Sequence, residues 1–441
     1  MAQDLDRDPL RMALTRVHII GAGMAGLSAA VTLAEAGIPA TLFEAGPAAG
    51  GRCRSYFDKH LGVRLDNGNH LLLSGNDAAM HYLTTIGARD TLTGPGRAVF
   101  PFIDAKTDER WIVAPGAGKI PWWILFNRIP GTKLSDYLAL ARLKYAKPGQ
   151  TVEQVLGGSE LYRKLLEPLA ISALNTMPHQ ALATLLWAVG EGSLLRGGSA
   201  CEPLIPREGL SESLVDPAIA YLAARGGILH TATRVSAIRE SRDRIIGLSL
   251  PGGDVEIGED EAVVLATPPW VSMDLLPGLI VPEDFEAIAN LHYRVGAANE
   301  LPDLGAFAGE AGFVGVVGGL SEWVFAKPGV LSVTVSAANR YADLPNEEMA
   351  ERCWQEICRL RGAALPLPPF RCVREKRATF AASAASEARR SGTYVGIANF
   401  AVAGDWTSTL LPSTIEGAIR SGVTAASSLL ANHAARSTEP A

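Results

Sequence analysis

The 441-residue sequence predicts an α/β fold in which a parallel sheet is joined to a second, mixed α+β domain. A short apolar run, Val17–Ile20, is followed by a glycine-rich turn and an Ala/Leu-rich helical stretch, Met24–Ala36. A second apolar run, Ala40–Phe43, comes next. Strand, glycine turn, helix and strand in this order form a βαβ unit, whose sheet is parallel. At ~150 residues per domain, the chain can hold two large domains or three smaller ones.

Later segments return to the same sheet. Glu261–Ala266 is an apolar strand, and Ala398–Asn432 contains a strand, a glycine turn and a long Ala/Ser/Leu helix. Pro206–Ala224 contains a loop and a helix, and short strands follow it. The sheet domain is therefore discontinuous, and we expect two domains and two flexible tails. Their ranges are 15–75, 205–270 and 370–432 for the sheet domain, 76–204 and 271–369 for the substrate-binding domain, and 1–14 and 433–441 for the tails.

Composition excludes several classes of function. The net charge is −6 and no Lys/Arg run occurs, so no nucleic-acid partner is expected. The odd, scattered cysteines fit neither a disulfide framework nor a metal site; they are Cys53, Cys201, Cys353, Cys358 and Cys372. The polar first ten residues and the lack of ~18 consecutive apolar residues predict a cytoplasmic protein without a spanning helix. Peripheral contact with the inner face of the cytoplasmic membrane stays open.

The first turn carries a G-x-G-x-x-G motif, Gly21-Ala22-Gly23-Met24-Ala25-Gly26. Gly21 permits the tight turn, Gly23 lets the backbone approach a pyrophosphate, and Gly26 lets helix and strand pack closely. The free N–H groups of Met24, Ala25 and the helix start then face the phosphates. Glu44, followed by Ala45, ends the second strand, where a carboxylate accepts hydrogen bonds from ribose hydroxyls. A plain tight turn would not explain why all these elements occur together.

A second glycine turn, Gly50-Gly51-Arg52, follows Glu44 directly. Gly51 allows close approach, and Arg52 suits an anionic pyrophosphate better than a role as a solvated surface charge. In these motifs the sequence resembles the FAD-dependent amine oxidase and phytoene desaturase superfamily, whose signature continues as G-G-R-x-x-S. The resemblance implies a Rossmann-like FAD-binding domain with an inserted substrate domain.

The resemblance returns near the C-terminus, in Ala403-Gly404-Asp405-Trp406 and Thr414-Ile415-Glu416-Gly417-Ala418. It implies that Gly404 and Asp405 contact the ribityl and phosphate groups of FAD, and that Thr414 and Ile415 begin a helix aimed at the flavin ring. It also implies contacts from Val235 to the adenine and from Thr267 to the cofactor. No cysteine lies in this stretch, so we expect non-covalent FAD. No second G-x-G-x-x-G occurs, so the electron donor is unidentified: a protein partner, a free carrier, quinone or oxygen.

The string Asp66-Asn67-Gly68-Asn69-His70-Leu71-Leu72-Leu73-Ser74-Gly75-Asn76 is similar to hydroxysqualene dehydroxylases. Asn175-Thr176 and Glu375–Phe380 also resemble that family. The resemblance implies reduction of an allylic triterpene alcohol to squalene, in squalene and hopanoid biosynthesis, with reduced FAD as the hydride source. A carotenoid- or phytoene-type desaturase shares every cofactor motif and remains an alternative, as does another oxidase of the flavin amine oxidase family. A non-redox escort module for prenylated proteins is the alternative of another class, and the intact C-terminal motif disfavours it.

Candidate catalytic residues come from this string and from one lysine. Histidine has the pKa range of a general acid, so His70 is the first candidate to protonate the hydroxyl. A structural histidine bonded to backbone is the competing interpretation. Asn67, Gly68 and Asn69 are expected beside the flavin, with the two asparagines as positioning groups. Lys376 could hold a water near the flavin, although a solvated charge fits it better.

A hydrophobic substrate needs an entrance to the active site. Residues 119–128 combine large apolar side chains with basic flanks, which suits insertion at a membrane interface; the apolar residues include Trp122, Trp123 and Phe126. An ordinary core helix is an equally good interpretation.

Overall fold

The computed structural model describes residues 14–116, 118, 124, 128–296, 311–362 and 364–436. Its first layer is a five-stranded parallel sheet in the order β10-β2-β1-β14-β20. The strands are β1 (Arg16–Ile20), β2 (Ala40–Phe43), β10 (Ile228–His230), β14 (Glu261–Leu265) and β20 (Phe400–Val402). The βαβ unit and the strand expected at Glu261–Ala266 are confirmed within one residue. The C-terminal strand and helix are also confirmed, but the helix ends at Arg436, four residues past its expected end.

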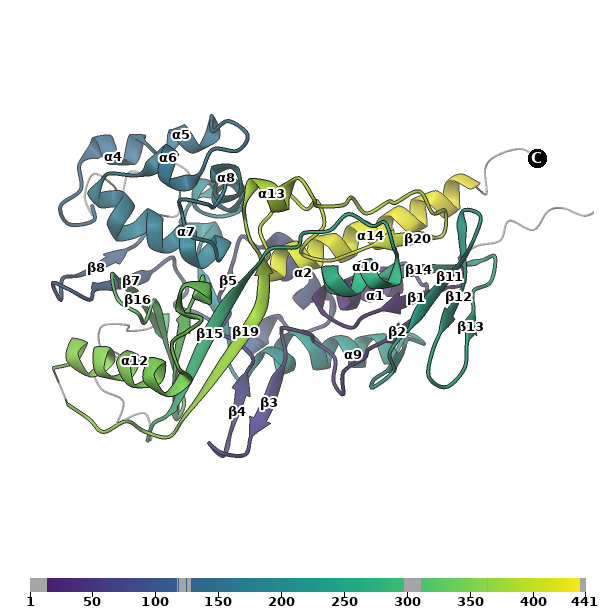
Figure 1. The fold of residues 1–441 in the computed structure, drawn as a ribbon, viewed down its shortest axis with the longest axis horizontal. Helices are drawn as coiled ribbons and strands as arrows, with labels where there is room; N and C mark the ends of the chain where they lie inside the picture. The colour runs from purple at the N-terminus through teal and green to yellow at the C-terminus, as the bar shows by residue number, and fades with distance from the viewer. Residues whose placement is uncertain are drawn as a thin grey trace, which may run out of the picture.

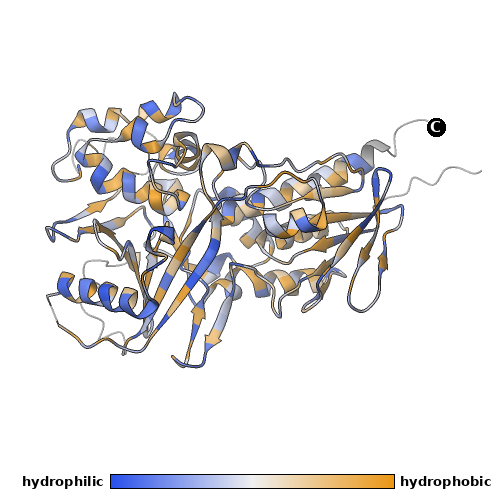
Figure 2. Cartoon of the chain, viewed as in Figure 1, coloured by the Kyte–Doolittle hydropathy of each residue, from blue (hydrophilic) through white to orange (hydrophobic). Residues whose placement is uncertain are grey.

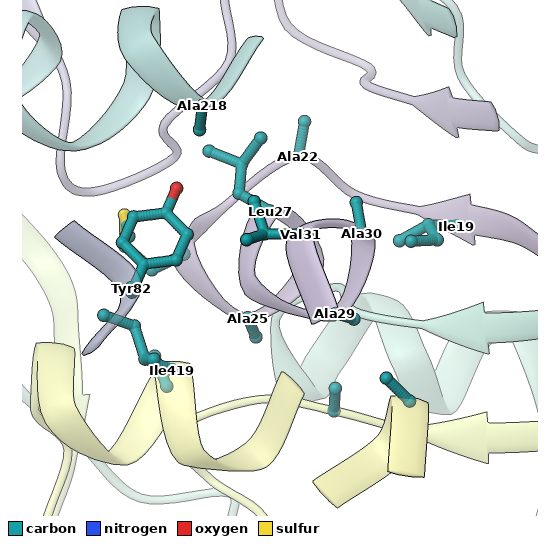
Figure 3. Close-up of a cluster of buried hydrophobic side chains, with 14 of the residues drawn as sticks. Ile19, Ala22, Ala25, Leu27, Ala29, Ala30, Val31, Tyr82, Ala218 and Ile419 are labelled. Atoms are coloured by element: carbon teal, nitrogen blue, oxygen red, sulfur yellow. The ribbon is translucent and has the colours of Figure 1, made fainter. Parts of the chain in front are cut away.

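Helix α1 (Met24–Glu35) is buried on nearly all sides between this sheet and α14 (Ile415–Arg436). The two helices approach closely because Gly422 has no side chain: a Cβ there would lie 2.2 Å from the carbonyl oxygen of Ala25. Ser28 Oγ also donates to the carbonyl of Ile419 across the contact, at 3.0 Å. Figure 3 shows the apolar side chains around α1, including Leu27, Val31 and Ile419.

The second large sheet is a mixed, seven-stranded sheet in the order β19-β15-β18-β17-β16-β7-β8. Its strands are β7 (Phe100–Asp104), β8 (Arg110–Val113), β15 (Phe285–Arg294), β16 (Phe313–Val317), β17 (Trp323–Lys327), β18 (Val330–Val335) and β19 (Phe370–Phe380). Thus the last range expected for the sheet domain, 370–432, begins with a strand of this second sheet. Long strands β15 and β19 run from the helices over the first sheet into the part of the molecule built on the second sheet (Figure 1).

Helices cover both faces of the second sheet. Helix α12 (Asn346–Leu360) buries one apolar stripe against it, and the alternating orange and blue of α12 in Figure 2 reflects this amphipathic pattern. The opposite face packs against a helical group around Phe102 and Trp111. That group consists of α4 (Leu134–Leu138), α5 (Ala141–Lys144), α6 (Val152–Leu156), α7 (Glu167–Leu174) and α8 (Ala183–Gly192).

The remaining strands form three small sheets. The first is the hairpin of β3 (Ser55–Asp58) and β4 (Val63–Asp66), the second joins β5 (Leu72–Leu73), β6 (Leu92–Thr93) and β9 (Pro203–Pro206), and the third joins β11 (Ala237–Ser241), β12 (Arg244–Ser249) and β13 (Val255–Glu256). Four further α-helices are α2 (Asp77–Thr85), α9 (Asp216–Ala223), α10 (Pro269–Leu275) and α13 (Ala384–Glu387). Within the described ranges, no helix combines the length and apolar character needed to cross a bilayer. Trp122, Trp123 and Phe126 lie outside the described residues.

Candidate active site

The carboxyl ends of the parallel strands gather the residues of the first glycine motif. Gly21 follows β1 with φ +102°, a conformation that a side chain would strain, and a Cβ there would lie 2.5 Å from the carbonyl oxygen of Ala266. A Cβ at Gly26 would lie 2.0 Å from the carbonyl oxygen of Gly21. Gly23, by contrast, faces open space, and no side chain caps the start of α1. Free N–H groups beside open space fit a pyrophosphate.

The second glycine turn lies against the first one. Gly23 and Gly50 form an isolated parallel bridge, and a Cβ at Gly51 would be 3.3 Å from the Cα of Gly23. Glu44 accepts from the backbone N–H of Ala22 at 2.9 Å and of Gly46 at 2.7 Å, which holds its carboxylate at the turn. Ala45 is exposed beside it.

Backbone hydrogen bonds bring the segment before Val235 alongside Glu44. Ala232 and Thr233 donate to the carbonyls of Gly46 and Glu44, at 2.7 and 2.8 Å. Val235 itself is buried. These contacts bring the segment to the carboxylate of Glu44, beside the two glycine turns, which together with Glu44 are called the cradle below.

Arg52 and Asp405 form an ion pair of 2.6 Å although 353 positions separate them in sequence. Arg52 also donates to the carbonyl of Ala378, and Asp405 accepts from Ser413 Oγ. A small cavity opens beside this pair, lined also by Trp270 and Trp406. Gly404 is needed here because a Cβ would collide with the Trp406 ring.

Arg390, which the sequence gave no reason to single out, holds the loop that carries Asp405. Its guanidinium is completely buried and donates to the carbonyl of Thr407 and to Thr409 Oγ1, the latter at 2.8 Å. The Trp406 indole in turn donates to the carbonyl of Thr267 at 3.0 Å. Thr267 lies two residues past the end of β14, and this bond ties it to the loop that carries Asp405.

Thr414 is the N-terminal cap of α14, since its Oγ1 accepts from the N–H of Gly417 at 3.0 Å. Ile415 begins the helix and is buried. The carboxylate of Glu416 instead accepts from the N–H groups of Ala78 and Ala79, at 3.1 and 2.9 Å. The acid of the E-G-A motif thus caps α2 and joins it to α14.

The polar loop, residues 67–70, lies against the second sheet. Asn69 N donates to Asn290 Oδ1 at 3.4 Å, and Asn69 Nδ2 donates to Thr334 Oγ1 at 3.0 Å. Asn67 is buried, and its side chain makes no hydrogen bond within the described ranges. Gly68 faces Asn290, whose Nδ2 would be 3.1 Å from a Cβ at that position.

His70 ends the loop and is partly buried. Burial lowers its pKa to about 4; Asp66 opposes this shift, while the charges of Arg52 and Lys327 favour it. No residue in the described part of the chain hydrogen-bonds the His70 ring. Lys376 lies exposed on β19, an environment typical of a solvated charge.

Two polar residues near the loop, Lys327 and His292, had no recognisable sequence signal. Lys327 on β17 pairs with buried Asp66 at 2.5 Å, and Asp66 also accepts from Ser55 Oγ at 2.6 Å. His292 Nδ1 lies 2.6 Å from Ser332 Oγ. The Lys327–Asp66 and His292–Ser332 pairs join positions 261 and 40 residues apart, so only strand pairing and domain packing reveal them.

An aromatic cluster adjoins the end of the loop. Phe313 lies 5.8 Å from both Trp323 and Phe325, measured between ring centroids, and Leu71 packs on the cluster. The end of the polar loop is therefore influenced by the cations Arg52 and Lys327 and is followed by a residue packed on aromatic rings. Among the residues that the structure describes, no group of His, Cys, Asp and Glu could hold a metal ion.

The fold and cradle define a flavoprotein oxidoreductase. The family model described as flavin containing amine oxidoreductase matches residues 24–430, so the chain belongs to this family and is an FAD-dependent enzyme. Solved structures share the fold at low identity. Cyclohexylamine oxidase from Brevibacterium oxydans has a TM-score of 0.71 at 15% identity, covering 95% of this chain and 99% of its own. An oxidoreductase from Methanosarcina mazei has a TM-score of 0.69 at 16% identity, covering 94% and 100%.

Within the flavin family, the chain belongs to the hydroxysqualene dehydroxylases. It is 46% identical to the hydroxysqualene dehydroxylase of Rhodopseudomonas palustris, over 94% of this chain and 98% of the relative. It is 44% identical to that of Sinorhizobium fredii, over 93% and 97%. The enzyme from Zymomonas mobilis is 40% identical, over 93% and 97%.

Proposed function

We propose that this enzyme removes the allylic hydroxyl of hydroxysqualene reductively and releases squalene. The named activity of the relatives supports the substrate. The observation that supports the proposal is the neighbourhood of the polar loop: the charge of Arg52 acts on His70, and the next residue, Leu71, packs on the aromatic cluster. An alcohol with long hydrocarbon arms needs polar groups at its hydroxyl and apolar surfaces along its arms.

Each group has a defined task in the proposed reaction. When bound, reduced FAD supplies the hydride that replaces the hydroxyl. His70 protonates the hydroxyl so that the C–O bond breaks and water departs, while Asn67 and Asn69 position it. The ring faces of Trp323 and neighbouring phenylalanines stabilise the allylic cation that remains. Apolar surroundings exclude the water that would trap that cation.

The residues of the cradle support the assignment of non-covalent FAD contacts. We assign the pyrophosphate to the two glycine turns, the ribose to Glu44, and the ribityl chain and flavin ring to the region of Asp405 and the start of α14. Arg52 serves the phosphates once they are present. Lys376 stays a secondary candidate for holding a water.

Contact with a membrane surface is also part of the proposal, because the substrate is a lipid. It rests on residues 119–128 and on the neighbouring helices α4 and α5. Leu138 and Tyr145 are 76% and 77% exposed there, among exposed basic side chains such as Lys144. We infer a cytoplasmic enzyme that visits the inner membrane face and receives electrons from an unidentified donor.

An anaerobic single turnover tests the function. The FAD-loaded enzyme is reduced by light or dithionite, and 12-hydroxysqualene is added in detergent. We expect flavin reoxidation with one squalene formed per flavin, measured by absorbance and mass spectrometry. A flavin that stays reduced contradicts the proposal and would make the carotenoid-type desaturase the leading alternative.

A further inference from the structure

One row of paired residues crosses the second sheet beside the polar loop. Strand register places Asn290 next to Thr334, Thr334 next to Trp323, and Trp323 next to Gly315. Directly paired residues share one face of a sheet. The row therefore changes from two polar side chains to an aromatic one within three neighbouring strands.

The amide of Asn290 has a defined orientation. Its Oδ1 accepts from Thr334 Oγ1 at 2.9 Å and from the N–H of Asn69 at 3.4 Å. The Thr334 hydroxyl is in turn fixed because it accepts from Asn69 Nδ2 at 3.0 Å. Oδ1 therefore has two donors. Nδ2, the other end of the amide, faces Gly68 of the polar loop.

This arrangement leaves one donor and one acceptor unused. Asn290 is only 2% exposed, yet its Nδ2 has no hydrogen-bond partner in the described part of the chain. Asn69 Oδ1 is likewise buried without a partner among the described residues. A buried acceptor without a partner, such as Asn69 Oδ1, is costly, and Asn290 Nδ2 offers an unused donor, so a ligand that satisfies both would bind favourably.

An alcohol is a suitable ligand for such a pair. We propose that Asn290 Nδ2 donates to the hydroxyl oxygen of the substrate while Asn69 Oδ1 accepts the hydroxyl hydrogen. This inference rests on the proposed function and adds Asn290, oriented by Thr334, as the residue that recognises the hydroxyl. One lone pair of the oxygen stays free for the incoming proton.

Asn290 Nδ2 and Asn69 Oδ1, together called the hydroxyl anchor, make the site selective for the alcohol over the hydrocarbon product. Squalene would leave both polar atoms unpaired, which corresponds to a preference of about 10- to 100-fold for hydroxysqualene. Loss of the hydroxyl thereby promotes release of the product.

The test is equilibrium binding to the oxidised, FAD-loaded enzyme, in which no turnover occurs. Squalene and 12-hydroxysqualene are titrated in detergent, and the perturbed visible band of the flavin reports binding. We expect Asn290→Leu to bring the ratio of the two dissociation constants close to one, with FAD content unchanged. Thr334→Val, which removes the group orienting Asn290, should lower the ratio in the same direction and serves if the first variant does not fold.

Ser332→Ala is the matched control. Ser332 is the next residue of β18 on the same face, and it contacts His292 instead of the anchor. The control should keep the wild-type ratio. A wild-type ratio in Asn290→Leu would overturn the anchor while leaving the dehydroxylase intact. Loss of FAD from Asn290→Leu would also overturn it, since Nδ2 would then serve the cofactor. A wild-type enzyme that neither discriminates nor turns over would overturn both proposals.

Discussion

At the scale of single residues, the charges around His70 decide what its ring can do. Burial and two neighbouring cations, Arg52 and Lys327, outweigh the carboxylate of Asp66, so the pKa falls to about 4. The protonated ring is the form that donates a proton. Its population therefore falls about tenfold for each pH unit above that pKa.

This gives a pH prediction for the proposed acid. If His70 supplies the proton, the single-turnover rate should rise about tenfold per unit as pH falls from 8 to 6, because the whole range lies above the pKa. His70→Gln should cost about 10²- to 10⁴-fold and flatten the profile, as measured by stopped-flow absorbance. A flat wild-type profile, with a loss below about tenfold in His70→Gln, would reduce the ring to a hydrogen-bonding role.

The site residues that the sequence predicted lie in continuous local motifs, whereas the residues that it missed act through partners far away in the sequence. Gly21 and Gly23 lie in one glycine turn and Arg52 lies in a second. Each turn is a short continuous motif whose residue spacing is visible in the sequence. Asn290 and Arg390 act through partners distant in sequence, and a lone Asn in a strand or an Arg beside another Arg carries no local signal.

At the scale of elements, the crossing of α1 and α14 carries the cofactor cradle. Both helices begin at the cradle, and their contact depends on Gly422. A methyl group there would lie 2.0 Å from Ser28 Oγ and 2.2 Å from the carbonyl oxygen of Ala25. Since the second of these is backbone, a change of rotamer cannot relieve the overlap.

We therefore expect Gly422→Ala to destabilise the enzyme by about 1–3 kcal/mol and to weaken FAD binding. Thermal unfolding and flavin release measure the two effects. Gly190→Ala is the matched control: Gly190 lies in helix α8, and its Cβ would be no nearer than 3.8 Å to a neighbouring atom. The control should be neutral or stabilising by about 0.5–1 kcal/mol. Equal melting temperatures for the two variants would contradict the close-packing explanation.

At the scale of the whole molecule, the proposed active site draws its residues from the carboxyl ends of the parallel strands and from the second sheet. Long strands β15 and β19 connect the parts, and two ion pairs join the β3–β4 hairpin to the second sheet. These pairs are Asp66–Lys327 at 2.5 Å and Asp58–Arg371 at 2.6 Å. Helices α4 and α5 lie at the far end of the substrate part (Figure 1).

The membrane proposal belongs to this scale. Replacing Trp122, Trp123 and Phe126 with Ser should release the protein from anionic liposomes while leaving FAD bound, because a net charge of −6 makes binding depend on a local apolar and basic patch. Sedimentation with vesicles measures the effect. Phe57→Ser is the matched control, since Phe57 is 61% exposed on β3, away from α4 and α5. Unchanged pelleting of the triple variant would exclude this surface.

The sequence alone determined the βαβ unit, the glycine turns and the family, because these depend on local spacing and on continuous motifs. Through resemblance it also predicted that the polar loop lies beside the flavin, which stays a prediction. Only the tertiary structure decided that Glu416 caps α2, that Arg52 reaches Asp405, and that the loop meets Asn290 and Thr334. Those contacts depend on strand register and on the packing of two sheets, which bring together residues hundreds of positions apart.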